Sequence, residues 1–203
     1  MNEKAVTQSA RAGSREDIVG SDRQIAHRGD NSNGSAVGRP GADRWHNLIV
    51  SNTAIAIGSR MHGHKCEIYI SNMRVKLRNN FSCCPDLVVV SGEPSFADAN
   101  IDVLTNPTLV VDVFSNGTDT SGKTKKLESF LETDSIKECL LIKRDEMRIE
   151  HYARQNQKQW IYRIYNERDD VVSLDSINCK ISLQEIYAQI KFRQAELSSR
   201  AVN

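Results

Sequence analysis

The chain has 203 residues, 39% of them apolar and 26% charged, and its formal net charge is +1. This length suits one domain with a buried core, and the near-neutral charge excludes a general affinity for nucleic acid, so any such contact needs a local basic patch. No long apolar run occurs and the amino terminus lacks the apolar stretch of a secretory signal, so we expect a cytoplasmic protein without a membrane span.

The cysteines also favour the cytoplasm. Their number is odd and no C-x-x-C pair occurs, which argues against a disulfide framework; they stand at positions 66, 83, 84, 139 and 179. Most border apolar runs, so we expect reduced, buried thiols. A cysteine nucleophile is the alternative, although no neighbouring residue resembles an activating base.

Residues 1–44 differ in composition from the rest of the chain. They contain no Phe, Trp or Tyr and hold six of the eleven glycines. Such a segment buries too little apolar surface to offset the entropy lost on ordering. We therefore expect residues 1–44 to form a disordered arm, residues 45–195 to form the folded domain and residues 196–203 to form a tail.

The domain opens with a predicted helix. Apolar residues recur at helical spacing after Asp43, which is a candidate N-cap, and Gly58 or Gly63 is the candidate helix end. Two alternating segments, 66–70 and 73–77, then flank Ser71 and Asn72 and predict a β-hairpin.

A buried strand is predicted at 86–90. A polar connection of 17 residues, "SGEPSFADANIDVLTNP", separates it from a second apolar strand at 108–115. Connections of this length are often functional or mobile.

The second half of the domain alternates helices and strands. A helix is predicted to end near Glu132, with Ser121 as its candidate cap, and a capping box joins Ser182 to Glu185 at the last helix. The predicted strands are 138–144 and an edge hairpin formed by 147–154 and 160–166. This order predicts an α/β fold in which one mixed sheet is flanked by helices.

One carboxylate lies inside an apolar run that predicts a buried strand. Asp112 lies within "VVDVF", and apolar neighbours on both faces predict a central, doubly covered strand. A buried carboxylate is costly unless it meets a cation. Asp86 precedes the other apolar strand and Lys126 lies one element later, so the three together predict a Mg²⁺ site with a nearby positive charge.

The segment "PDLVVVSGEP…NPTLVVDVFSNGTDTSGKTKKLESFLETDSIKECLLI" resembles the Uma-two family of restriction endonucleases, within the PD-(D/E)XK nuclease superfamily. The resemblance runs from about His46 to about Phe192 and is free of gaps from Asn106 to Ile142. It implies a restriction-endonuclease-like mixed sheet and Mg²⁺-dependent hydrolysis of DNA phosphodiester bonds, with Mn²⁺ as an alternative ion. DNA is the implied partner, and restriction-like enzymes often act as homodimers.

The resemblance also implies roles for the three residues. Asp86 matches the Asp of the family's "PD" and is implied as a metal ligand, and Asp112 takes the place of the family's strand Glu as the second ligand. Lys126 matches the lysine on the family's helix and is implied as catalytic. Phe114 stands two residues after Asp112, where the superfamily's name would place that lysine.

Several positions depart from the family pattern. Gly122 and Phe130 replace a usual Asp and Tyr, and residues 1–44 do not show the family's usual first hairpin with its acidic residue. These departures favour an alternative function, a non-catalytic DNA-binding or protein-interaction module on the same fold.

The remaining candidate residues have weaker patterns. For His46, on the first helix, a structural or DNA-facing role is favoured over catalysis, although family members often carry His there. His62 and His64 form a poor metal site because no third ligand is near. Trp160 and Tyr162 share one strand face, where packing is favoured over base stacking.

Overall fold

The computed structural model of the chain describes residues 30–32, 35–37, 43–61, 63, 65–78, 81–97, 102–115 and 120–192. Its centre is a mixed six-stranded sheet, as the sequence predicts, with the strand order β11 (Trp160–Tyr165), β10 (Ile149–Arg154), β9 (Glu138–Lys143), β8 (Leu109–Phe114), β6 (Leu87–Ser91) and β3 (Cys66–Ile70). The apolar strand β8 is central, and β10 and β11 form the predicted hairpin at one edge.

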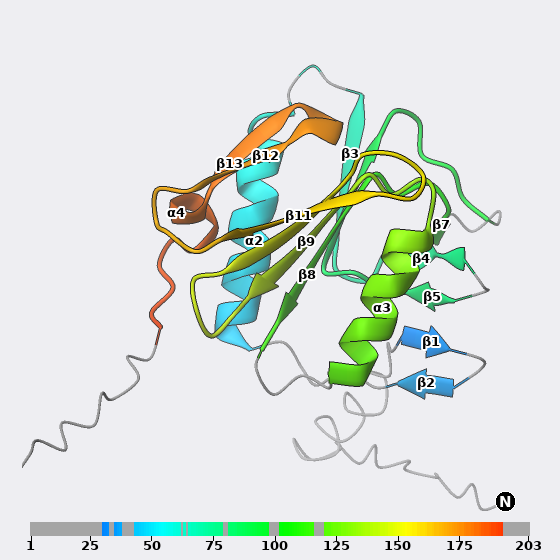
Figure 1. The fold of residues 1–203 in the computed structure, drawn as a ribbon, viewed down its shortest axis with the longest axis horizontal. Helices are drawn as coiled ribbons and strands as arrows, with labels where there is room; N and C mark the ends of the chain where they lie inside the picture. Colours follow the sequence, from blue (N-terminus) through cyan, green and yellow to red (C-terminus); the bar gives the residue numbers. More distant parts are fainter. Residues whose placement is uncertain are drawn as a thin grey trace, which may run out of the picture.

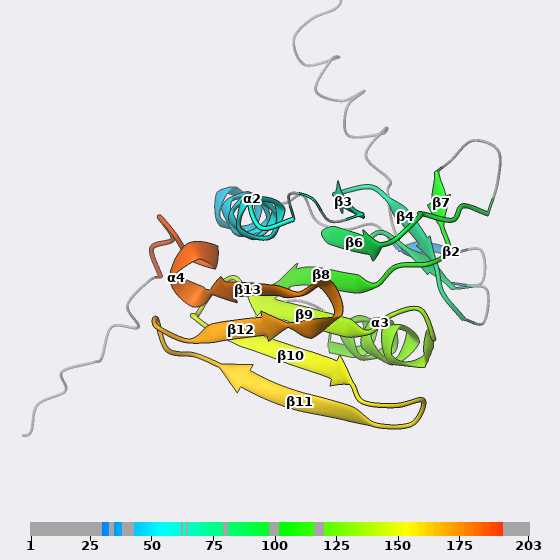
Figure 2. The same cartoon turned by 90° about the horizontal axis from the view of Figure 1, so that it is seen from above.

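The two faces of this sheet are covered by different elements (Figure 2). On one side lie α2 (Arg44–Gly58), α4 (Leu183–Ile186) and the hairpin of β12 (Val171–Leu174) and β13 (Cys179–Ser182). On the other side lie α3 (Thr120–Glu132) and a smaller sheet. Alternate residues of β8 serve the two cores: Val111 packs in the α2 layer, whereas Val110 packs with Phe130 of α3.

Helix α3 is the crossover between two parallel strands. Strands β8 and β9 pair in parallel, with Val110 opposite Cys139, and parallel neighbours require a connection of this kind. The helix therefore packs beside β8 and β9, on the opposite side of the sheet from α2 (Figure 1). Ser121, the predicted cap, lies inside this helix, which begins at Thr120, so that prediction is wrong.

The predicted hairpin of residues 66–77 does not form. Strand β3 pairs with β6 in the main sheet, whereas β4 (Arg74–Lys76) pairs with β5 (Ser82–Cys83) and β7 (Val103–Leu104) in the smaller sheet. Ser71 and Asn72 have φ of 44° and 83°, and Ser71 N–H donates to Asp86 O at 2.9 Å. This left-handed turn therefore sends the chain from one sheet to the other instead of folding it back on itself.

The smaller sheet is completed by residues of the predicted disordered arm. Strands β1 (Asp30–Ser32) and β2 (Ser35–Val37) form a hairpin ahead of α2, and β1 pairs with β5. The hairpin that the sequence did not reveal is thus present, and an acidic residue, Asp30, begins it. Asp43 and Arg44, at the end of the predicted arm, belong to the start of α2; the remaining residues of the arm and residues 196–203 lie outside the described residues.

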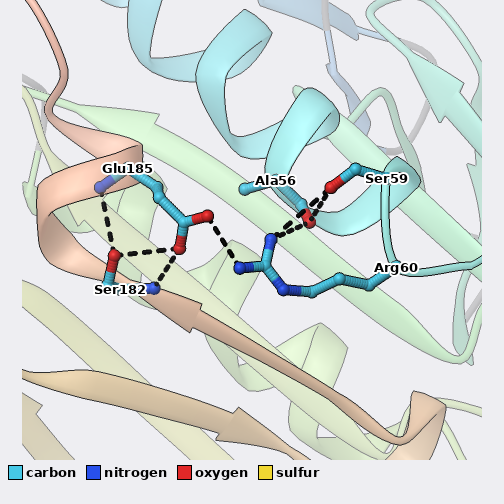
Figure 3. Close-up of polar contacts among 5 residues, drawn as sticks. All are labelled: Ala56, Ser59, Arg60, Ser182 and Glu185. Carbon is cyan, nitrogen blue, oxygen red and sulfur yellow. Dashed lines mark hydrogen bonds and ion pairs between the residues drawn. The ribbon is translucent and has the colours of Figure 1, made fainter.

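Both predicted helix caps at the α2 layer are confirmed. Asp43 accepts a hydrogen bond from His46 N–H at 3.0 Å, and Ser182 and Glu185 form the full capping box at α4. Figure 3 shows how Glu185 also joins the two helices: its Oε1 lies 2.7 Å from Nη2 of Arg60, whose Nη1 donates to Ala56 O. Gly58 ends α2 as predicted.

The hairpin β12–β13 was not predicted, and a buried carboxylate fastens it to the main sheet. Glu138 on β9 contacts His151 Nε2 on β10 at 3.0 Å and accepts a hydrogen bond from Ser176 N–H at 3.0 Å. Ser176 lies in the short 3₁₀ helix η2 (Asp175–Ile177) that joins β12 to β13. Glu138 and His151 are buried, so the pair holds this layer on the sheet without contact with solvent.

Candidate active site

The register of β6 and β8 brings the two predicted carboxylates together. Leu87 pairs with Val111 in this antiparallel ladder, so the next position along places Asp86 opposite Asp112. Both side chains lie on the α3 face, because they alternate with Leu87 and Val111, which belong to the α2 core. The two strands are neighbours in the sheet, as the predicted site requires.

Each carboxylate is held by the backbone of the other strand. Asp86 Oδ2 accepts a hydrogen bond from Val113 N–H at 2.7 Å, and Asp112 Oδ1 accepts one from Asp86 N–H at 3.2 Å. Asp86 and Asp112 are only 6% and 8% exposed, so these bonds offset part of the cost of removing the charges from water. The geometry fixes both groups before any ligand arrives.

The predicted lysine reaches the same place from α3. Lys126 Nζ lies 2.6 Å from Asp112 Oδ2, and Lys126 is itself buried. One helical turn later, Phe130 is fully buried against the sheet, with its ring centroid 5.6 Å from Lys126 Nζ. The apolar face of α3 therefore fixes the rotation of the helix that points Lys126 at Asp112.

The carboxyl end of α3 is fixed by an arginine from β10. The Arg154 guanidinium donates to the carbonyl oxygens of Leu131, Thr133 and Ile136, each at 2.8 Å. It also stacks on Trp160, with 4.2 Å between the guanidinium carbon and the ring centroid. These bonds satisfy carbonyl groups that a helix end leaves open, and they hold α3 on the strand next to β9.

A fourth side chain joins the group from the first turn of α2. His46 Nε2 lies 3.2 Å from Asp86 Oδ1. The cap formed by Asp43 starts α2 three residues earlier and so directs His46 to Asp86. Sequence reasoning favoured a structural or DNA-facing role for His46 and missed this contact, although the frequent His at this position in the family was a signal for it.

The donor set fits a hard divalent cation. Asp86 and Asp112 lie opposite each other on neighbouring strands and Lys126 contacts Asp112, and Mg²⁺ in proteins is commonly bound by one or two carboxylates together with waters and phosphate oxygens. Among the residues that the structure describes, no group of three or more His, Cys, Asp or Glu side chains could enclose a metal. A metal ion held by only two carboxylates would keep other coordination positions for waters and substrate oxygens.

Other candidate residues do not enter the site as reactive groups. All five cysteines are free, as expected. Cys139 lies behind the site on β9, where burial raises the pKa of its thiol well above the ordinary value, and the nearby Asp112 acts in the same direction. A thiol of this kind is a poor nucleophile. His62 and His64 lie outside the described residues.

Comparison with known proteins agrees with this geometry. Residues 24–184 match the model of the Uma2 family, which is described as "Putative restriction endonuclease". The chain belongs to the Uma2 family. The family resemblance seen in the sequence is thus confirmed, and the match begins ahead of the β1–β2 hairpin.

Relatives of this Uma2 chain include two proteins of Synechocystis sp., both described as uncharacterized. One, sll1609, is 27% identical over 141 residues, covering 69% of this chain and 80% of its own length. The other, slr1290, is 25% identical over 154 residues, covering 75% of this chain and 79% of its own.

A solved structure shares the fold. It is described as a "putative nuclease belonging to DUF820" from Anabaena variabilis, with a TM-score of 0.67 and 18% sequence identity over 80% of this chain and 90% of that one. The predicted mixed α/β fold is therefore confirmed. In the part of the Uma2 chain that the structure describes, no helix has the length and apolar character needed to cross a membrane.

Proposed function

We propose that this Uma2 chain is a Mg²⁺-dependent DNA endonuclease that hydrolyses phosphodiester bonds, with Asp86 and Asp112 as metal ligands and Lys126 as a catalytic residue. Mn²⁺ is an alternative ion. The observation that carries the proposal is the convergence of two backbone-held carboxylates and one ammonium group, from the start of β6, from β8 and from α3, in one buried cluster.

Each residue has a distinct task in the proposed reaction. Asp86 and Asp112 hold the cation, which when bound supplies Lewis-acid charge at the scissile phosphate and lowers the pKa of a coordinated water. Lys126, at 2.6 Å from Asp112, donates hydrogen bonds to the attacking water or to the phosphate oxygens on which charge develops. His46 contacts Asp86 and keeps that carboxylate oriented, as partners of metal ligands commonly do.

The test is a plasmid-nicking assay with purified protein across Mg²⁺ and Mn²⁺ concentrations. We expect wild type to convert supercoiled plasmid to nicked plasmid only when a divalent ion is present. Asp112→Asn should abolish nicking, because it removes a ligand charge while it keeps the shape of the side chain. Asp134→Asn is the matched control, since Asp134 is exposed on the surface after α3 and should leave nicking unchanged.

A second function, a non-catalytic DNA-binding module, is favoured by one specific observation. Phe130 lies beside Lys126 and lacks the hydroxyl group of the Tyr that the family usually carries at this position. DNA binding measured with and without Mg²⁺, beside the nicking assay, separates the two functions. Binding of DNA that does not depend on the metal, without nicking in either ion, would replace the nuclease by this module.

The setting and the assembly of the protein are also part of the proposal. Five free thiols suit a reducing cytoplasm. A homodimer is proposed because restriction-like enzymes often act in pairs, and the exposed Tyr162 and Ile164 on edge strand β11 are supporting observations. Light scattering after gel filtration measures the mass directly, and a monomer at all concentrations would remove this part of the proposal.

A further inference from the structure

A second group of charged residues lies immediately beside the candidate active site. One row of the main sheet crosses Phe114 on β8 and Lys143 on β9, which are paired in register. Lys143 N–H donates to Arg148 O at 2.9 Å, so Arg148 continues the row toward β10. This row lies two residues beyond Asp112 along β8 and on the same face of the sheet.

Helix α3 adds a third cation to this row. Lys123 Nζ lies 3.4 Å from the centroid of the Phe114 ring and 3.9 Å from Glu150 Oε2. The side chain of Lys123 is 26% exposed, so its ammonium group is partly covered by the sheet but still reaches solvent. Lys123 thus delivers a positive charge above the side chain at position 114 (Figure 2 shows α3 on this face).

The positive charges in this group exceed the negative ones. Glu150 is shared by two cations: its Oε2 lies 3.9 Å from Lys123 Nζ and its Oε1 lies 3.4 Å from Arg148 Nε. The third cation pairs with Glu146, whose Oε1 lies 2.5 Å from Lys143 Nζ. Three cations therefore face two carboxylates. The amino end of α3, whose first turn has no acidic residue, adds further positive potential.

The electrostatics of Lys123 point in the same direction. Partial burial lowers the pKa of Lys123; Glu150 opposes this effect, and Lys143 and Arg148 add to it. Such a site gains from an anion that relieves the repulsion among its cations. The side chains of Lys123, Lys143 and Arg148 are each partly exposed, and each carries donors that suit phosphate oxygens.

We propose that Lys123, Lys143 and Arg148 form a phosphate-binding site that holds the DNA backbone phosphate next to the one cleaved at Asp86 and Asp112. Two residues of strand separate this site from Asp112, a span of about 6–7 Å, which is comparable to the distance between neighbouring phosphates on one strand. The inference rests on the proposed function. It makes these three cations positioning residues that set the register of the substrate strand.

The experiment measures the affinity of a short labelled DNA duplex in EDTA, so that binding is separated from cleavage, over a range of salt concentrations. Lys123→Met should raise Kd about tenfold and reduce the slope of log Kd against log salt by about 1, because one phosphate contact is lost. Lys143→Met should act similarly. Lys125→Met is the matched control, because Lys125 is exposed and lies about 200° around the same helix.

A second arm locates the phosphate. Once the nick made by wild type has been mapped on the duplex, a neutral methylphosphonate is placed at each flanking phosphate in turn. At one of these positions the methylphosphonate should weaken DNA binding by wild type as much as Lys123→Met does. It should not weaken DNA binding by Lys123→Met any further. Thermal melting of each variant confirms that it is folded.

The outcomes separate this site from the nuclease function. If wild type nicks DNA but Lys123→Met and Lys125→Met bind equally well, the phosphate site is wrong and the nuclease proposal stands. If wild type never nicks but Lys123→Met still weakens binding selectively, the site stands as a DNA contact of a non-catalytic protein. If wild type does not bind DNA at all, both proposals fall.

Discussion

Lys126 Nζ lies 2.6 Å from Asp112 Oδ2, yet the two residues belong to different elements, a helix and the central strand on which it packs. The position of the ammonium group therefore depends on how α3 is seated on the sheet and not on local strand geometry. This dependence links the stability of the fold to the chemistry of the site.

Replacing Lys126 by Met should destabilise the metal-free protein by about 3 kcal/mol, because a buried ion pair loses its cation and Asp112 stays charged. Denaturant unfolding measures this loss. Mg²⁺ should restore part of it, since the ion takes over the missing charge. The double variant Asp112→Asn, Lys126→Met should be closer to wild type than Lys126→Met alone. A loss in the double variant equal to the sum of the losses in the two single variants would mean that the pair contributes no coupling.

Replacing His46 by Ala should weaken Mg²⁺ binding by about 10-fold to 100-fold, because Asp86 loses the partner that orients one of its oxygens. Calorimetry of Mg²⁺ binding is the measurement. Asn47→Ala changes the next residue of the same helix turn and serves as the control. An unchanged Mg²⁺ affinity in His46→Ala would return His46 to the structural role that the sequence favoured.

Replacing Arg154 by Ala should cost about 2–4 kcal/mol of stability, since three carbonyl groups around the end of α3 lose their donor and Trp160 loses its stacking partner. Thermal unfolding reports the change. Arg163→Ala, on the exposed part of β11, should change stability by no more than about 0.5 kcal/mol. Similar losses in the two variants would show that the bonds to α3 are not what Arg154 provides.

The contribution of Glu185 to stability should disappear in acid. Partial burial by itself would raise the pKa of Glu185, but hydrogen bonds from Ser182 and the Arg60 guanidinium together lower it below the ordinary value. A group with a lowered folded-state pKa stabilises the protein above its unfolded pKa, about 4.3, and this stabilisation is lost as pH falls through the folded-state pKa.

The measurement compares unfolding of wild type and Glu185→Ala between pH 7 and pH 3. The difference should be about 1 kcal/mol at neutral pH, a modest value because the ion pair is 38% exposed, and it should shrink toward zero in acid. Gln184→Ala, the neighbouring residue without these contacts, should show no such pH dependence. A difference that stays constant down to pH 3 would contradict the assignment.

Sequence patterns predicted the parts of this molecule that local chemistry determines. Asp43 and Ser182 were recognisable because capping depends on a few adjacent residues, and the buried strand around Asp112 was recognisable from its uninterrupted apolar run. The pair Asp86 and Asp112 also followed from the sequence, because each precedes or interrupts such a run and a carboxylate there needs a cation.

The failures have a physical origin in tertiary pairing. The hairpin predicted around Ser71 has a suitable turn, but β3 gains more from pairing with the apolar strand β6 than it could from β4. Strands of two to four residues, such as β5 and β12, show too few alternations for a pattern to appear. The contact of His46 with Asp86 depends on the packing of α2, so the residues around His46 do not predict it, and only the frequent His at this position in the family pointed to it.

The alternation of β8 between two apolar layers has an evolutionary consequence. If one residue were inserted between Leu109 and Asp112, the side chains beyond it would move to the opposite face of the sheet, so that the Asp112 carboxylate would enter the apolar layer under α2 and a valine would take its place beside Lys126. Such a one-residue insertion would therefore disrupt both the folding of the protein and the candidate active site. Homologous chains should therefore keep the length of this strand.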